Sequence, residues 1–244
     1  MTEWFRRSLD RYVQACAWLV LKRHRPLIVG ITGTAGKSTT KEMLASILSE
    51  EAAVARFGPA LTTPGNMNDD RGLPLTVLGF KDWIVYGRLK PLFLYSLMPV
   101  RAAALALRSN YPGLLVLEFG THKHGHLHEL VRLARPLIGV VTNVGAAHLE
   151  TLGSLEGVAN EKAALVISPP RHGAVILGSG HSFVDYLASR AKAPVTVVDG
   201  VGFDLNRNVA REVARQLGLS SEGCCQTNAH FALIGAPLAL VGEL

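Results

Sequence analysis

From Pro26 onward, short continuous apolar runs alternate with segments of helical periodicity. The apolar runs predict buried strands at residues 26–32, 113–119, 137–143, 173–177 and 195–199. Helices are predicted at residues 38–49, 91–109, 125–134, 154–166, 181–191 and 206–217. Buried strands that alternate with helices are typical of an α/β fold, in which helices cover both faces of a mostly parallel sheet. Ligands of such sheets bind beyond the carboxyl ends of the strands.

The segment before the first strand is different, because residues 3–22 repeat apolar side chains at three- and four-residue steps. This pattern predicts an amphipathic helix. The favoured interpretation is a helix that packs on the domain that follows it. The alternative is a cationic helix that lies on an anionic membrane surface.

Two other segments lack a clear period. Residues 53–82 mix short apolar stretches with the turn-rich loop "TTPGNMNDDRGLP", and residues 220–244 show no helical repeat. We therefore divide the chain into an N-terminal helix at 1–25, an α/β domain at 26–219 and an irregular tail at 220–244.

Composition and charge exclude several classes of protein. The 244 residues are 48% hydrophobic and 18% charged, which is ample for a core. Residues 1–25 hold six Lys or Arg and two acids, so most of the net charge of +6 lies there and the body of the chain is nearly neutral. A nearly neutral body argues against a groove for nucleic acid.

The three cysteines, Cys16, Cys224 and Cys225, fit neither a disulfide framework nor a zinc pattern. A reducing cytoplasm is the predicted compartment. Charges interrupt the N-terminal segment, so no signal peptide is expected. The apolar region at 83–107 contains charges and prolines that leave its runs far short of the ~20 residues of a membrane span.

The stretch "GITGTAGKSTTKEM", residues 30–43, predicts a phosphate-binding loop between a strand and a helix. Gly36, Lys37 and Ser38 match the end of the pattern G-x-x-x-x-G-K-[ST], although its first glycine falls one position early, at Gly30. Inward N–H groups and the helix N-terminus favour phosphate. Lys37 can reach the outer phosphates, and Ser38 can bind magnesium. A plain glycine turn would not need the lysine, the hydroxyl and the helix together.

Further chemical groups follow later strands. Glu118 ends an apolar strand, where a carboxylate can bind the magnesium of ATP, although such acids also cap helices. Asn143 ends the next strand, His148 follows in a loop and Lys162 lies on the next predicted helix. Taken singly, a loop histidine is usually solvated and a helix lysine is usually a surface charge.

Alternating histidines occupy "THKHGHLHEL", namely His122, His124, His126 and His128. Such a tract can bind a transition metal. A solvated loop is the favoured interpretation.

Together these stretches resemble the Mur ligase family, the ATP-dependent amide ligases of peptidoglycan synthesis. The resemblance covers about residues 26–177 and rests on "GITGTAGKSTTKEM", "TTPGNMNDDRGLPLTVL", "LVLEFGTHKHGHLHEL" and "RPLIGVVTNVGAAHLETLGSLEGVANEKAALV". These motifs look most like the branch that adds D-alanyl-D-alanine to UDP-muramoyl tripeptide. The resemblance implies the P-loop NTPase-like central domain of the family, with ATP and Mg²⁺ as cofactors.

The resemblance also implies a role for each matching position. Nucleotide would be bound by Gly33, Thr34, Ala35, Gly36, Lys37, Ser38, Thr39 and Asn143, with Asn208 near the adenine. Ser38 and Glu118 would bind a first magnesium and His148 a second, with Lys162 as a carbamylated ligand. The catalytic groups would be Lys37, His148 and Lys162. The nucleotide-sugar substrate would face Thr62, Thr63, Asn66 and Asn68.

The implied reaction activates a carboxylate as an acyl phosphate, which an amine attacks. The partners would be a UDP-muramoyl peptide and an amine dipeptide. Family members have three domains, and we recognise neither the UDP-binding domain nor the C-terminal domain here. Two hypotheses follow: an amide ligase core, or a non-catalytic Mg-ATP-binding module that needs a partner to supply the C-terminal domain. A generic regulatory NTPase would leave "GNMNDDRGLP", His148 and Lys162 unexplained.

Overall fold

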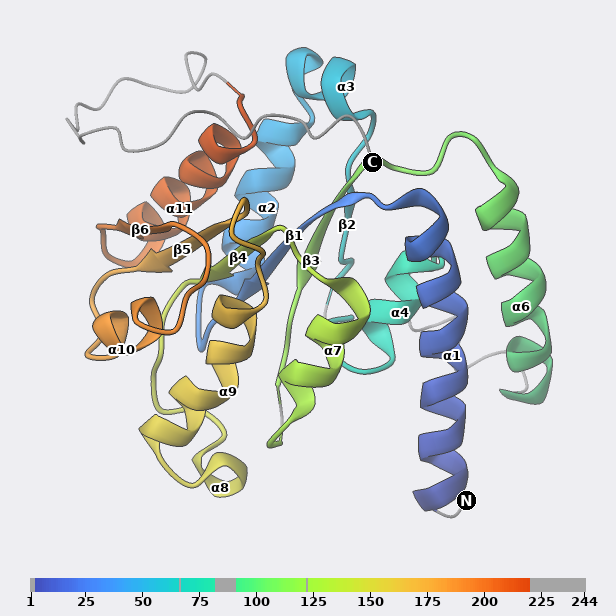
Figure 1. The fold of residues 1–244 in the computed structure, drawn as a ribbon, viewed down its shortest axis with the longest axis horizontal. Coiled ribbons are helices and arrows are strands. Elements are labelled where there is room, and N and C mark those ends of the chain that lie inside the picture. The colour runs from blue at the N-terminus through green and yellow to red at the C-terminus, as the bar shows by residue number, and fades with distance from the viewer. Residues whose placement is uncertain (1–2, 66, 82–90, 122, 220–244) are drawn as a thin grey trace.

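The computed structural model describes residues 3–65, 67–81, 91–121 and 123–219 (Figure 1). Within these residues, six parallel strands form one sheet in the order β2-β3-β1-β4-β5-β6. The strands are β1 (Leu27–Thr32), β2 (Leu61–Thr62), β3 (Leu114–Glu118), β4 (Ile138–Val141), β5 (Ala174–Gly178) and β6 (Val195–Val198). The predicted parallel α/β fold is confirmed.

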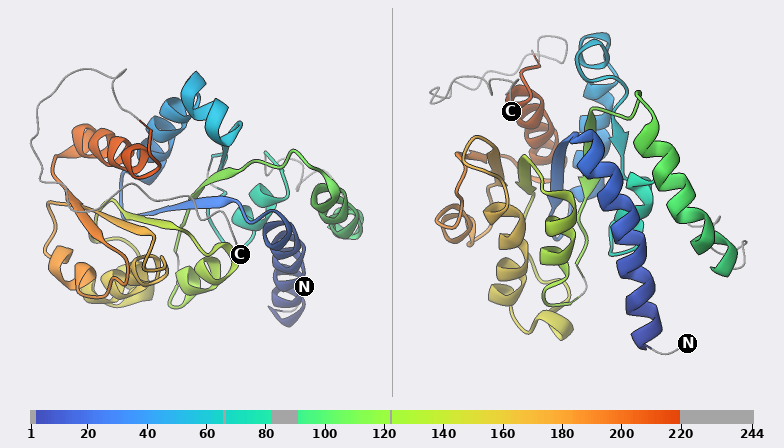
Figure 2. Two further views of the ribbon diagram at one scale, coloured as in Figure 1. Left: turned by 45° about the horizontal axis from the view of Figure 1, so that its top comes forward. Right: turned by 45° about the vertical axis from the view of Figure 1, so that its right-hand side comes forward.

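Helices cover both faces of this sheet (Figures 1 and 2). They are α1 (Glu3–His24), α2 (Lys37–Leu48), α3 (Glu51–Phe57), α4 (Gly72–Val77), α6 (Pro91–Leu107), α7 (His126–Ala134), α8 (Leu149–Leu152), α9 (Leu155–Ile167), α10 (Val184–Ala188) and α11 (Gly202–Gln216). In the described part of the chain, no helix is both long and apolar enough to cross a membrane.

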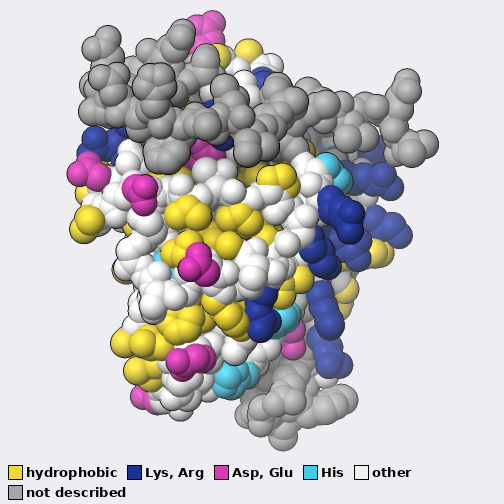
Figure 3. Space-filling model, turned by 60° about the vertical axis from the view of Figure 1, so that its left-hand side comes forward, with side chains coloured by type: hydrophobic (Ala, Val, Ile, Leu, Met, Phe, Trp, Pro, Cys, Tyr) yellow, Lys and Arg dark blue, Asp and Glu magenta, His cyan; other side chains and the backbone are white. Residues whose placement is uncertain are grey.

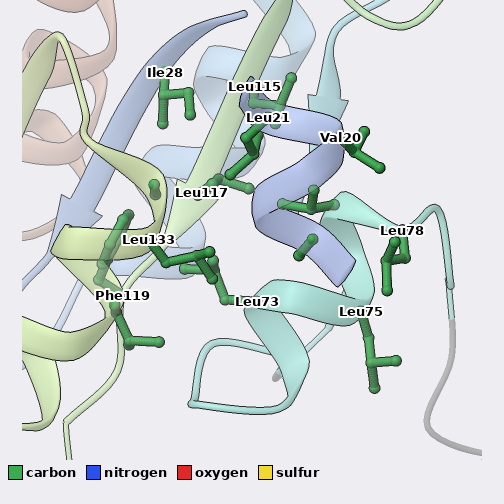
Figure 4. Close-up of a cluster of buried hydrophobic side chains, with 14 of the residues drawn as sticks. Val20, Leu21, Ile28, Leu73, Leu75, Leu78, Leu115, Leu117, Phe119 and Leu133 are labelled. Atoms are coloured by element: carbon green, nitrogen blue, oxygen red, sulfur yellow. The ribbon is translucent and has the colours of Figure 1, made fainter. Parts of the chain in front are cut away.

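Side chains of β3 alternate between two cores, as expected for a central parallel strand. Leu114 and Val116 pack with residues of α2 and α11 on one face. Leu115 and Leu117 face the other way, into a cluster with side chains of α1, α4 and α7 (Figure 4). Because both faces of β3 are buried, its carboxyl end is fixed, and Glu118 stands at that end.

The N-terminal helix α1 packs against α6, α4 and α7. Val13, Ala17 and Val20 of α1 are buried in the same cluster as β3. At its C-terminal end, the ring of His24 stacks on Tyr111 at 4.6 Å between centroids. These contacts confirm the prediction that this amphipathic helix packs on the domain.

The sequence patterns missed or misjudged several short elements. β2 is only two residues long, and its pairing of Leu61 with Leu115 defines it as a strand. α3, α4 and α8 lie in segments that we had not predicted to be helical. The helix predicted at 181–191 is wrong in length, because α10 spans only five residues. The N–H of Phe183 donates to the His181 ring, which holds the preceding residues in a turn.

Candidate functional site

The loop from Gly33 to Gly36 joins β1 to α2 and requires glycine at two positions. Gly33 has a φ of 155° and Gly36 a φ of 81°. A Cβ atom at Gly33 would lie 1.9 Å from Thr142 Oγ1, and one at Gly36 would lie 2.3 Å from Asn206 Oδ1. The loop is therefore packed between the end of β4 and α11, and the N-terminus of α2 follows it directly.

Residues after β4 hold this phosphate loop in place. Asn143 Oδ1 accepts hydrogen bonds from the backbone N–H groups of Thr34 and Ala35, both at 2.9 Å. Thr142 Oγ1 donates to the carbonyl of Ala35 at 2.6 Å. The side chain of Asn143 thus positions the loop, and its predicted contact with nucleotide stays a prediction.

Lys37 is the first residue of α2 and folds back over the loop. Its Nζ donates to the carbonyl of Gly33 at 2.7 Å and approaches that of Thr34 at 3.5 Å. Burial lowers the pKa of Lys37, while the attraction of Glu118 acts in the opposite direction. The ammonium is therefore held where phosphates would meet the loop, next to Ser38 and Thr39 of the first helical turn.

Glu118 is a buried carboxylate, 2% exposed, that two elements contact from opposite sides. From α2, Ser38 Oγ donates to Oε2 at 2.9 Å. From the loop after β2, Asn68 Nδ2 donates to Oε1 at 2.8 Å, and Thr63 Oγ1 accepts from the backbone N–H of Glu118 at 2.9 Å. The predicted pair of Ser38 and Glu118 is therefore brought together, and two predicted substrate residues support it.

A small cavity of about 70 Å³ lies beside these groups. Its lining includes Gly33 and Lys37 of the phosphate loop and helix, Asn68, and the predicted site residues His148 and Lys162. His148 has a φ of 56°, an uncommon conformation for a residue other than glycine, and precedes α8. The structure thus brings together groups from four segments that are far apart in the sequence.

Lys162 is buried in α9, with 3% of its surface exposed. Its pKa is lowered from 10.5 to about 7, first by burial and then by repulsion from Lys37, while Glu161 opposes the shift. This shift favours the neutral amine, which is the form that can react with CO₂. The chemistry of the site therefore suits the predicted carbamylation.

Oxygen ligands at this site suit magnesium. Within the described residues, no group of three or more His, Cys, Asp or Glu side chains could hold a metal by itself. The Ser38 hydroxyl and the Glu118 carboxylate instead offer two oxygen ligands that lie 2.9 Å apart. Mg²⁺ binds through one or two protein oxygens while it keeps waters and substrate phosphates, so these residues fit it.

The remaining predicted residues are placed as follows. Thr62 is half-buried in β2, and Asn66 lies outside the described residues. Asn208 donates to the carbonyl of Asp199 at 3.0 Å, so its role near adenine stays a prediction. Asn206, which we had not singled out, lies over Gly36 and accepts from Thr40 Oγ1 at 3.3 Å.

The histidine tract is not simply a solvated loop. His124 and His128 are exposed, whereas His126 is 2% exposed and its Nε2 lies 2.8 Å from Asp70 Oδ1. The prediction of a solvated loop is wrong for His126, because this residue begins α7 on the side that faces the core. His122 lies outside the described residues.

Two functional candidates were missed in the sequence. Lys41 is 4% exposed and its Nζ lies 3.5 Å from Glu118 Oε2. Its spacing of four residues from Lys37 places both on one side of α2, and that was the available signal. Glu161 accepts hydrogen bonds from the N–H groups of Gly125 and Leu127, at the start of α7. Nothing in the sequence separates Glu161 from an ordinary surface acid.

Comparisons with known proteins identify the family and the fold of the chain. A family model described as the Mur ligase middle domain matches residues 31–87 and 98–240. A UDP-N-acetylmuramoyl-tripeptide–D-alanyl-D-alanine ligase of Mycobacterium tuberculosis (strain H37Rv) is 35% identical over 171 residues, which are 70% of this chain and 27% of that protein.

Two solved structures share the fold. MurF from Acinetobacter baumannii matches with a TM-score of 0.66 and 22% identity, over 86% of this chain and 47% of that one. A MurF ligase from Thermotoga maritima, solved in complex with ADP, matches with a TM-score of 0.63 and 22% identity, over 87% of this chain and 50% of that one. The present chain thus spans about half the length of these two structures and 27% of the length of the curated relative.

The contact between Asp70 and His126 predicts a pH-dependent stability. The pKa of Asp70 is lowered from 3.8 to about 2, chiefly by the hydrogen bond from His126. A lowered carboxyl pKa contributes stability above the unfolded value, and this contribution is lost as the pH falls toward 2. We expect Asp70→Asn to reduce the free energy of unfolding by about 1–2 kcal/mol at pH 6, and by less at pH 3.

Urea denaturation of both proteins at the two pH values measures this difference. Asp199→Asn removes an exposed aspartate and is the matched control. A gap between wild type and Asp70→Asn that stays constant from pH 6 to pH 3 would contradict the expectation.

Proposed function

Because the chain belongs to the Mur ligase family through its middle domain, we propose that it is the ATP-dependent core of an amide ligase. One observation carries this proposal. Lys37, Ser38 and Glu118 converge at the carboxyl ends of β1 and β3, and His148 and Lys162 line the adjoining cavity. This is the edge of a parallel sheet where ligands bind.

The reaction would run in two steps. A carboxylate oxygen of the substrate attacks the γ-phosphorus of ATP, and ADP leaves. The nitrogen of an amine then attacks the acyl carbon, phosphate leaves with the electrons of the C–O bond, and the nitrogen loses a proton. The Lys37 ammonium would balance charge on the transferred phosphoryl group, and the packed phosphate loop would hold the nucleotide in line.

Magnesium, when held by Ser38 and Glu118, would supply further neutralisation of the phosphate oxygens. His148 would serve a second magnesium. Lys162 would join it as a carbamate, since its neutral amine can add CO₂ and release a proton. The first assignment rests on the contact between Ser38 and Glu118, and the other two rest on the cavity that His148 and Lys162 share and on the depressed pKa of Lys162.

The substrates would be a UDP-muramoyl peptide that supplies the carboxylate and a D-alanyl-D-alanine-like dipeptide that supplies the amine, in the cytoplasm. The matched relative from M. tuberculosis is named a UDP-N-acetylmuramoyl-tripeptide–D-alanyl-D-alanine ligase. Thr62 ends β2, and Thr63 and Asn68 lie on the loop after it, which would face the carboxylate substrate; Asn68 connects that loop to Glu118.

Nucleotide binding tests the proposal directly. The protein should bind Mg-ATP, and Lys37→Ala should weaken binding by about 10-fold to 100-fold, because a charge-assisted contact to phosphate is lost. Isothermal titration calorimetry gives both affinities. Lys192→Ala, which removes an exposed lysine, is the control and should bind as the wild type does. Equal affinity in Lys37→Ala would remove Lys37 from the site.

The alternative is a non-catalytic Mg-ATP-binding module, or one that needs a partner to present the amine. The matched segment covers 27% of the ligase from M. tuberculosis. We expect slow ATP hydrolysis but little amide formation by the chain alone. Positioning of the amine is worth about 7–11 kcal/mol of the barrier, and an open site admits water to the acyl phosphate.

Mass spectrometry of the products, with the chain alone and with candidate partner proteins added, measures amide formation. Robust ligation by the chain alone would show that no partner is needed. No ligation with any partner, together with normal Mg-ATP binding, would favour the non-catalytic module.

We also propose that residues 3–22 make a peripheral membrane contact. One side of α1 is buried, while Arg11 and Lys22 are exposed beside Trp18 (43% exposed) and Leu19 (45% exposed). Lys and Arg side chains gather along one edge of the face in Figure 3. Cationic and aromatic side chains together suit an anionic lipid surface.

Vesicle sedimentation tests this contact. Binding to vesicles that contain anionic phosphatidylglycerol should exceed binding to neutral phosphatidylcholine vesicles. The double variant Arg11→Glu/Lys22→Glu should lower it by about 10-fold or more, at roughly 1 kcal/mol for each basic residue. Arg171→Glu, an exposed change far along the chain, is the control. Equal binding to both vesicle types would leave α1 a purely structural helix.

A further inference from the structure

Lys41 is a buried cation that the mechanism above does not use. It lies in the second turn of α2 and is 4% exposed, which is rare for a lysine unless it is paired. Its Nζ lies 3.5 Å from Oε2 of Glu118, which is itself 2% exposed. Lys41 is not among the residues that line the small cavity beside the phosphate loop, whereas Lys37 is.

The two oxygens of Glu118 have different neighbours. Oε1 accepts from Asn68, on the loop after β2. Oε2 accepts from Ser38 and faces Lys41, both on α2. The oxygen beside Ser38, which would be shared with a metal ion, is thus the one that the ammonium of Lys41 approaches.

We infer that Lys41 is a positioning residue for the metal-binding carboxylate: it balances the charge of Glu118 before magnesium arrives and holds Oε2 beside Ser38. This inference rests on the proposed function, since it takes Glu118 as a magnesium ligand. A buried carboxylate that loses its cation is strongly destabilising. A divalent ion bound to the same carboxylate can supply the missing positive charge. Magnesium and Lys41 therefore both neutralise the buried negative charge of Glu118.

This role differs measurably from that of an ordinary buried ion pair. Loss of a purely structural pair lowers stability equally with and without ligand. Loss of Lys41 should lower the stability mainly when no metal is bound. When magnesium is bound, its positive charge replaces that of the lost ammonium. Repulsion between the ammonium and Mg²⁺ also disappears, so the variant should need less magnesium to bind nucleotide.

The experiment compares wild type with Lys41→Met, which keeps a side chain of similar length without the charge. Thermal unfolding is followed in EDTA and in saturating Mg-ADP, and ADP binding is titrated with Mg²⁺. We expect a lower unfolding temperature in EDTA, recovery of most of that loss in Mg-ADP, and at least a threefold lower Mg²⁺ concentration at half-saturation. Lys192→Met removes the same charge from the surface and should change none of these.

Equal loss in EDTA and in Mg-ADP, or no loss in either, would overturn the inference and leave the proposed function standing. Absence of any Mg-ADP effect on the wild type would overturn both. If Lys41→Met does not fold, the double variant Lys41→Met/Glu118→Gln removes both charges and should recover folding in EDTA. A double variant that is no more stable than the single one would contradict the assigned charge balance.

Discussion

The buried carboxylate of Glu118 is the constraint around which the site is organised. A carboxylate with 2% exposure needs hydrogen bonds or a cation on each oxygen, because its hydration is lost. Ser38 and Lys41 satisfy Oε2 from α2, and Asn68 satisfies Oε1 from the loop after β2. One charge at the end of β3 therefore fixes the phosphate-loop helix and the predicted substrate loop relative to each other.

Parallel topology explains why these groups can meet. β1 lies between β3 and β4 in the sheet, so the loops that follow the three strands emerge at the same edge. Asn143, just after β4, uses its side-chain oxygen on two N–H groups of the loop after β1. Glycine at positions 33 and 36 lets that loop approach β4 and α11 more closely than any side chain would permit.

Local patterns in the sequence predicted the elements whose signals are local. Apolar runs located five of the six strands in the described sheet, and "GKS" with Glu118 located the centre of the site. What they could not predict depends on partners far along the chain. β2 is defined by its pairing with β3, and the burial of His126 depends on Asp70. The burial of Lys41 depends on the carboxylate of Glu118, which β3 places beside it in the fold.

Charge balance around Glu118 links these observations. Three lysines, at positions 37, 41 and 162, lie on the two helices that border the site, and each lowers its cost of burial differently. Lys37 donates to backbone carbonyls, and Lys41 faces Glu118. Lys162 has a pKa lowered to about 7 by burial and by Lys37. Glu161 opposes this shift, while its oxygens accept hydrogen bonds from backbone N–H groups at the start of α7. On α2, Lys37 and Lys41 outnumber the one buried carboxylate beside them, Glu118, and this excess of positive charge suits a polyanion such as a triphosphate held at a helix N-terminus.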